Sequence, residues 1–143
     1  MKIKYTLQAL ATAALLTLAQ AASAQVAVIV NPKSSLASLT TEQAASIFMG
    51  KSNTLPNGTT AMPADLPEAS AARDQFYSKA AGKTPSQVKA TWARLTFSGK
   101  ATAPRELPSA ADVKKHVANH PDAIGYIEKS AVDGTVKVVL IVE

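Results

Sequence analysis

Two polar residues near the start of a predicted helix have the types and the spacing of an anion site. Ser70 and Arg73 lie within one helical turn of each other in the stretch PADLPEASAARDQFY, residues 63–77. Asp65 is followed three residues later by Glu68, a capping-box pattern that predicts a helix beginning there. The first turn of a helix presents free backbone N–H groups and a positive dipole end, and a guanidinium donates paired hydrogen bonds to oxyanions. We therefore expect Asp65, Ser70 and Arg73 to bind a small anion, the alternative being an ordinary exposed helix face.

Ser34 and Ser35 form a second, weaker group of candidate ligands. They follow residues 25–30, an apolar run that predicts a strand buried on both faces. Thr40 and Gln43 then predict a capped helix, so that strand, loop and helix would open a βαβ unit. Because ligands of open α/β sheets bind beyond the carboxyl ends of the strands, both serines are candidates; the alternative is a solvated turn.

The pattern of histidines and cysteines argues against a metal centre and against catalysis. His116 and His120 lie four residues apart, but no glutamate completes a zinc-protease motif and Pro121 ends the helix at this point. With no cysteine in the chain, there is no thiolate ligand and no cysteine nucleophile. A nucleophile-elbow pattern is also missing. The sequence predicts no metal, no cofactor and no enzymatic activity.

The remaining elements predict one α/β sheet with about four helices packed on its faces. Further capping boxes mark helix starts at Thr84 and Ser109, and glycine follows the ends of three predicted helices. In chain order, the elements expected after the first strand and helix are a strand at 59–62, a helix from Asp65 to Gly82, a helix burying Val88, Trp92 and Leu95, a helix carrying Val113 and Val117, and strands at 123–127 and 136–142.

The first 24 residues have the pattern of a signal peptide. Lys2 and Lys4 precede an apolar run that is too short to span a membrane and leads to a small-residue cleavage site, Ala22-Ser23-Ala24. Removing 24 of the 143 residues leaves 119, one domain at 25–143, and removing both lysines lowers the formal net charge from +5 to +3. Periplasmic export is expected. The scattered lysines and few aromatic residues do not predict nucleic-acid binding, and no later segment predicts membrane insertion.

Three motifs carry a resemblance to a known family. They are LTTEQAASIFMGK at 39–51, WARLTFSGK at 92–100 and AIGYI at 123–127. In this order they resemble the phosphate-type substrate-binding proteins of ABC importers, and the chain is most similar to the short, single-lobe members. The resemblance implies one lobe of a type 2 periplasmic-binding-protein fold, phosphate or a similar oxyanion as ligand, and an ABC permease or another envelope protein as partner.

The same resemblance implies roles for residues 70–76. The Ser-Gly-Thr-x-x-x-Phe signature of the large phosphate binders falls on this range, with matches at Ser70 and Phe76, but alanines replace its glycine and threonine. The chain therefore lacks the glycine that lets the backbone approach the anion closely and the threonine hydroxyl that donates a hydrogen bond to it. The short members have an arginine before their Phe-Tyr pair, as Arg73 precedes Phe76-Tyr77 here, and this arginine would compensate. Replacing Arg73 should then weaken anion binding and leave stability nearly unchanged.

Two classes of function remain open on the sequence alone. One is binding of a small oxyanion linked to ABC-type uptake or sensing, with weak affinity because a single lobe leaves its ligand in contact with water. The other is a non-enzymatic envelope interaction module that kept the fold and lost tight ligand binding.

Overall fold

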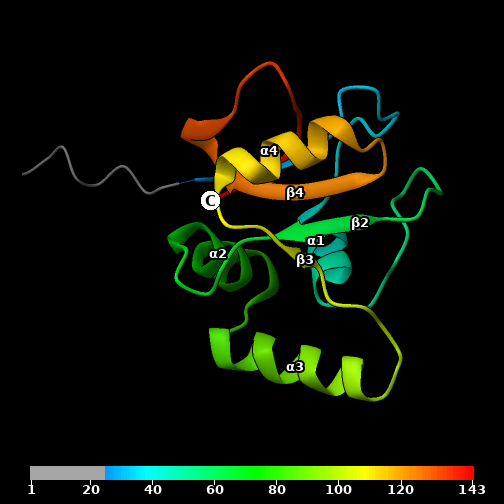
Figure 1. The fold of residues 1–143 in the computed structure, drawn as a ribbon, viewed down its shortest axis with the longest axis vertical. Helices are drawn as coiled ribbons and strands as arrows, with labels where there is room; N and C mark the ends of the chain where they lie inside the picture. Colours follow the sequence, from blue (N-terminus) through cyan, green and yellow to red (C-terminus); the bar gives the residue numbers. More distant parts are fainter. Residues whose placement is uncertain (1–24) are drawn as a thin grey trace, which may run out of the picture.

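The computed structural model describes residues 25–143, so the predicted signal peptide lies outside the described residues. A mixed sheet and four α-helices make up the fold (Figure 1). The strands are β1 Val26–Val30, β2 Met62–Asp65, β3 Arg105–Glu106, β4 Ala123–Glu128 and β5 Lys137–Val142; the helices are α1 Thr41–Phe48, α2 Ala71–Phe76, α3 Pro85–Phe97 and α4 Ala110–Asn119. A π-helical segment, Tyr77–Ala81, continues α2, and a 3₁₀ turn, Lys129–Ala131, follows β4. In the described part of the chain, no helix is both long and apolar enough to cross a bilayer.

The sheet has the strand order β3-β2-β4-β1-β5. β2 is parallel to β3 and β4, whereas β1 is antiparallel to both of its neighbours, β4 and β5. The predicted mixed sheet with four helices is confirmed. The predicted opening βαβ unit is wrong, because β1 runs against β4, and its carboxyl end therefore lies at the opposite end of the sheet from those of β2 and β4.

Three of the four predicted helix starts are correct because their signals are local. Thr40 and Thr84 each complete a capping box, with Gln43 and Gln87 respectively, and Ser109 caps α4 through the backbone N–H of Asp112. Each cap satisfies N–H groups that the first helical turn leaves without partners.

The predicted start of α2 is wrong. The N-cap is Ser70, whose hydroxyl oxygen accepts a hydrogen bond from the backbone N–H of Arg73 at 3.3 Å. Asp65 ends β2 and is buried, so its side chain cannot cap a helix together with Glu68. The strand predicted at 59–62 is displaced toward the carboxyl end of the chain, because β2 runs from Met62 to Asp65.

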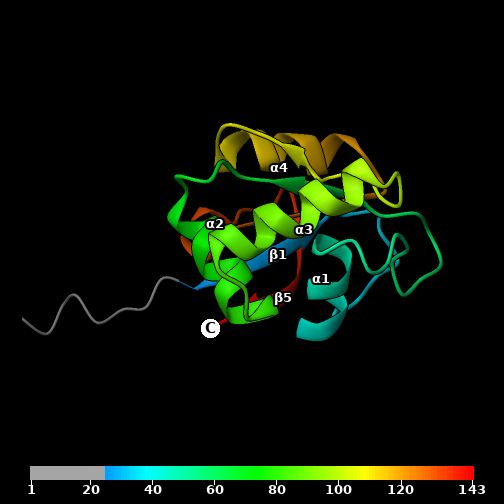
Figure 2. The ribbon, with the colours of Figure 1, turned by 90° about the horizontal axis from the view of Figure 1, so that it is seen from below.

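Aromatic residues and a glycine show which helix covers which face of the sheet. On one face, Phe48 of α1 and Phe76 of α2 pack against Tyr126 of β4, with ring centroids 5.5 and 4.3 Å from the tyrosine ring. The opposite face of β4 presents Gly125, where a Cβ atom would lie 2.6 Å from Cγ1 of Val113. α4 can approach the sheet this closely only because residue 125 has no side chain. Figure 2 shows α4 on the other side of β1 from α1.

α3 lies at the end of the molecule away from the sheet (Figure 1). The prediction that Val88, Trp92 and Leu95 form its buried face is correct in part: Val88 is buried, but Trp92 and Leu95 are half-buried. Both side chains pack against Gly50 at the end of α1, where a Cβ atom would come within 2.8 Å of each. β5 is an edge strand, so only Val139 and Val142 of its apolar residues are buried and the others are half-buried.

Candidate functional site

A buried carboxylate lies where β2 ends. Asp65 is 4% exposed, and its two oxygens accept hydrogen bonds from the hydroxyl groups of Tyr126 and Tyr77, the latter at 2.6 Å. The backbone N–H of Leu66 donates to the same carboxylate at 2.8 Å. Burying a carboxylate is costly unless it has several donors, and these three donors satisfy it.

Arg73 supplies the positive charge for this network. Its Nη1 donates to the carbonyl oxygen of Leu66 at 2.8 Å and lies 3.7 Å from Oδ2 of Asp65. The arginine side chain is 14% exposed, and its guanidinium carbon lies 5.5 Å from the centre of the Tyr77 ring. The structure therefore gives Arg73 partners within the protein, and anion binding by this residue stays a prediction.

The two tyrosines are held in the neutral form. Burial is the largest cause that raises the pKa of both hydroxyls well above the usual value for tyrosine, and the negative charge of Asp65 is the next. Tyr77 and Tyr126 thus remain hydrogen-bond donors over the whole physiological pH range. The π-helical segment continuing α2 begins at Tyr77, and β4 carries Tyr126, so three elements meet at one carboxylate.

The network fixes the loop that leads into α2, and this loop borders a groove. The groove has a volume of about 340 Å³ and lies between the amino ends of α2 and α4. Ser70 and Ser109, the two N-caps, line it together with Leu66 and the exposed Glu128 at the end of β4. Arg73 is not among its lining residues.

Free backbone donors accompany the two caps. In α2 the hydroxyl of Ser70 accepts from the third helical N–H, that of Arg73, which leaves the first two, those of Ala71 and Ala72, without an intrahelical acceptor. In α4 the hydroxyl oxygen of Ser109 accepts from the N–H of Asp112, the third helical residue, and leaves the N–H of Ala110 free, while the hydroxyl itself donates to the Asp112 carboxylate. The positive ends of two helix dipoles thus meet at one groove, an arrangement that favours a small anion.

The candidate serines of the first loop lie elsewhere. Ser34 accepts a hydrogen bond from the backbone N–H of Leu36 at 3.2 Å, and Ser35 accepts one from the side-chain amide of Asn57 at 3.1 Å. Because β1 is antiparallel to β4, this loop lies at the other end of the sheet from Asp65 and Ser70. The structure brings Asp65, Ser70 and Arg73 into one region and separates the first-loop serines from them.

The two histidines are close to each other but have few further ligands around them. Their ring centroids are 4.3 Å apart, and Nδ1 of His120 lies 2.7 Å from the carbonyl oxygen of His116. Burial, followed by repulsion from His120 and Arg105, lowers the pKa of His116. Within residues 25–143, no group of three or more histidine, cysteine or acidic side chains could hold a metal ion.

Sequence reasoning did not identify Tyr77, Tyr126 or Ser109 as parts of this region. The two tyrosines lie in quoted motifs, and a tyrosine within an apolar stretch needs a partner for its hydroxyl when it is buried. That signal predicts a polar partner without saying which one. Ser109 was recognised as a cap, but its position beside Ser70 depends on how α4 packs on the sheet.

Comparisons with known proteins give a consistent result for the fold. No family model matches the chain, and no curated protein matches it. Among solved structures, a protein from Clostridium perfringens named as a phosphate ABC transporter substrate-binding protein with bound phosphate has a TM-score of 0.66 and 22% identity, over 81% of this chain and 45% of that one. An ABC-type phosphate transport receptor from Vibrio cholerae has a TM-score of 0.62 and 20% identity, over 81% and 46% of the two chains.

A third solved structure, PstS from Borrelia burgdorferi, has a TM-score of 0.58 and 16% identity, over 81% of this chain and 47% of that one. The chain thus spans less than half the length of each of these proteins. At these identities the likeness is one of fold, and it confirms the resemblance read from the motifs at that level. The described part of the chain has the fold of about half of a phosphate ABC transporter substrate-binding protein.

Proposed function

We propose that this protein binds phosphate or a similar small oxyanion in the groove between the amino ends of α2 and α4. The observation that carries the proposal is that both N-caps, Ser70 and Ser109, line this one groove. The fold supports it, because a solved structure with the same fold over 81% of this chain is named as containing bound phosphate. These fold relatives are named as a substrate-binding protein and a transport receptor, not as enzymes.

The donors and the acceptor of the groove match the chemistry of phosphate. The free N–H groups of Ala72 and Ala110, which line the groove, and the hydroxyl of Ser70 can donate to its oxygens. Glu128 can accept a hydrogen bond from the P–OH group that phosphate retains near neutral pH, whereas sulfate has no such proton. Phosphate should therefore bind more tightly than sulfate. Since the groove is open to water, the dissociation constant should be about micromolar to millimolar and should rise with salt.

In this proposal Arg73 positions the binding loop through Leu66 and Asp65 instead of holding the anion. Export to the periplasm and a role in ABC-type uptake or sensing, with a permease as partner, complete the proposed function. They rest on the signal-peptide pattern and on the names of the fold relatives.

Two substitutions test the groove while keeping both helices intact. Ala110→Pro removes the free N–H at the first helical position of α4, where proline is well tolerated, and Ser109 already has the extended backbone that a following proline requires. Ser70→Asp keeps an excellent cap and places a negative charge at the site. Calorimetry should show phosphate affinity reduced roughly five- to tenfold by Ala110→Pro and at least tenfold by Ser70→Asp.

Matched controls come from α1, whose amino end lies outside the groove. Thr41→Pro and Thr40→Asp make the same changes at the same helical positions, and both should leave phosphate affinity unchanged. Thermal unfolding of all four variants should stay close to that of the parent. Equal phosphate affinity in the parent, Ala110→Pro and Ser70→Asp proteins would refute this site.

The second candidate function, an interaction module, is favoured by one exposed aromatic residue. Phe97, the last residue of α3, is 94% exposed, and large aromatic side chains of this kind are enriched in protein interfaces. A photo-crosslinking residue at position 97 should then capture one envelope protein in cells, and the same residue at exposed position 33 should not. No position-specific product, together with measurable phosphate binding, would remove this candidate.

A further inference from the structure

Two helices of this protein end in the same dipeptide and meet at one cavity. α1 is followed by Gly50-Lys51 and α3 by Gly99-Lys100, and all four residues line a cavity of about 840 Å³. This cavity lies outside the groove of the proposed phosphate site, since the two share no lining residue. Pockets of this size are typical of organic ligands.

The backbone fixes both lysines in the same way. Each glycine has a left-handed conformation, with φ of 75° at Gly50 and 70° at Gly99. The backbone N–H of Lys51 donates to the carbonyl oxygen of Ser46 at 2.8 Å, and that of Lys100 donates to Leu95 at 3.0 Å. These are the bonds of two Schellman motifs, which place each lysine two residues after the C-cap of its helix. Both lysines are therefore attached to well-defined backbone.

Arg105 adds a third positive charge to the cavity. It lines the cavity together with His116, and no aspartate or glutamate is among the lining residues. In the described part of the chain the ion pairs are Arg73–Asp65 and Lys114–Asp133, so Lys51, Lys100 and Arg105 form none. The carboxyl ends of α1 and α3 contribute roughly half a negative charge each, which three full positive charges exceed.

Trp92 gives the cavity a rigid aromatic wall. Its indole N–H donates to the carbonyl oxygen of Phe48 at 2.9 Å, and its ring packs over Gly50, where any side chain would collide with it. Ile47 and Met62 extend the apolar surface, and Met62 is 42% exposed. The cavity therefore combines unpaired cations with a fixed apolar surface.

We infer that this cavity binds organic anions that join a doubly charged head, such as a phosphomonoester, to an apolar body. The head would contact Lys51, Lys100 and Arg105, and the apolar body would lie against Trp92. A guanidinium and two ammonium groups favour a dianionic phosphoryl group over a single carboxylate. Inorganic phosphate would use only the cationic part and should bind here more weakly than a phosphomonoester.

Phenyl phosphate is a suitable probe, and Trp92 is a built-in reporter because it is the single tryptophan of the chain. The titration should use the Ser70→Asp variant, in which the proposed phosphate groove is blocked, so that a failure here is separate from a failure there. Saturable change in tryptophan fluorescence is expected with phenyl phosphate. Phenol, which lacks the charge, and inorganic phosphate, which lacks the ring, should each bind at least several-fold more weakly.

Lys51→Ala, Lys100→Ala and Arg105→Ala should each weaken phenyl phosphate binding roughly three- to tenfold, and added salt should weaken it further. Lys83→Ala is the matched control: Lys83 also follows a left-handed glycine at a helix end, Gly82, but does not line this cavity. The Lys83→Ala variant should bind phenyl phosphate with the same affinity as the parent. The inference is overturned if phenyl phosphate gives no saturable signal, or if the three cation variants bind it as tightly as Lys83→Ala does.

Discussion

The end of β2 and the cavity between α1 and α3 use positive charge in opposite ways. At the end of β2, Arg73 is mostly buried, bonded to a carbonyl oxygen and close to the Asp65 carboxylate. Around the cavity, Lys51, Lys100 and Arg105 have no acidic partner among the described residues. A cation beside a helix start is thus not always free to bind a ligand, because a neighbouring buried carboxylate can already be its partner. Both regions contain positive charge, and they differ in whether the cations have an acidic partner within the protein.

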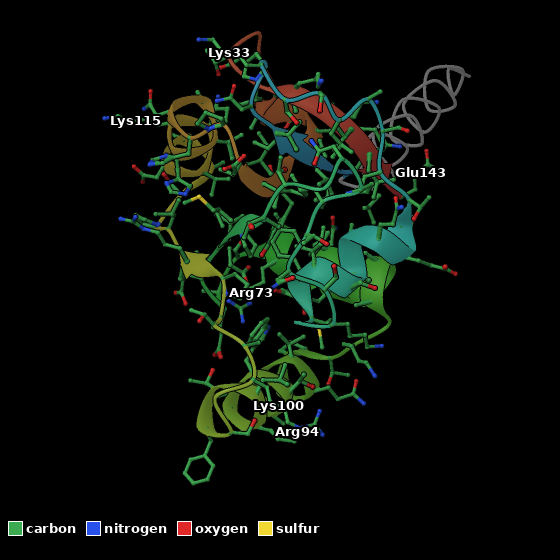
Figure 3. The ribbon with its side chains drawn as sticks, turned by 90° about the vertical axis from the view of Figure 1, so that its right-hand side faces the viewer. Lys33, Arg73, Arg94, Lys100, Lys115 and Glu143 are labelled. Carbon is green, nitrogen blue, oxygen red and sulfur yellow. The ribbon has the colours of Figure 1, made fainter. Side chains whose placement is uncertain are left out.

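Figure 3 shows where several basic residues of the protein lie. Arg73 lies between α3 and the rest of the fold, while Lys100 lies with Arg94 at the end formed by α3, and Lys33 and Lys115 lie at the opposite end. If the comparison is right, changes at the end of β2 should act mainly on stability, and changes around the cavity should act mainly on binding.

Removal of the buried carboxylate should have the largest effect on stability. Asp65→Ala leaves two tyrosine hydroxyls, one backbone N–H and the Arg73 charge without their acceptor, and should lower the free energy of unfolding by about 3–5 kcal/mol. Chemical denaturation followed by circular dichroism measures this loss. Asp122→Ala, which removes an exposed carboxylate that forms no ion pair among the described residues, is the control and should have only a slight effect. Equal stability of the two variants would contradict a structural role for Asp65.

Alkaline pH should destabilise the protein strongly, through the same network. The pKa values of Tyr77 and Tyr126 are raised in the folded state, so above about pH 10 the unfolded chain loses phenolic protons that the folded protein retains. Stability is then complete below that pH and falls by about 1.4 kcal/mol per pH unit for each tyrosine above it. In the protein without residues 1–24, whose tyrosines are Tyr77 and Tyr126, tyrosinate absorbance should rise together with unfolding. A rise that precedes the loss of secondary structure would show that the hydroxyls are accessible.

Arg73→Ala should have the next largest effect, a loss of about 1–3 kcal/mol, because it leaves the Leu66 carbonyl and the Asp65 carboxylate without a donor and a counter-charge. This differs from the expectation based on sequence, in which stability barely changes. Lys100→Ala removes a cation that forms no ion pair and should stay within about 0.5 kcal/mol of the parent. The two variants compare a cation that has a partner within the protein with one that forms no ion pair. A smaller loss of stability for Arg73→Ala than for Lys100→Ala would contradict that difference.

Much of the fold follows from the sequence because its signals are short. The hydrogen bonds of the Thr40 and Thr84 capping boxes join residues three apart, and those of the Gly50-Lys51 and Gly99-Lys100 ends close within six residues. Such patterns fix helix boundaries whatever the rest of the chain does. The three motifs also predicted a fold that the solved structures confirm.

Only the tertiary structure decided what the polar residues do. The Asp65–Tyr126 bond joins residues 61 positions apart, and its formation turned a predicted cap into the acceptor of a buried network that holds Arg73. The antiparallel pairing of β1 with β4 likewise separated Ser34 and Ser35 from Ser70. Strand direction and long-range side-chain pairing depend on how whole elements pack. That packing sums many contacts between residues far apart in the sequence, so a short stretch of about ten residues does not predict it.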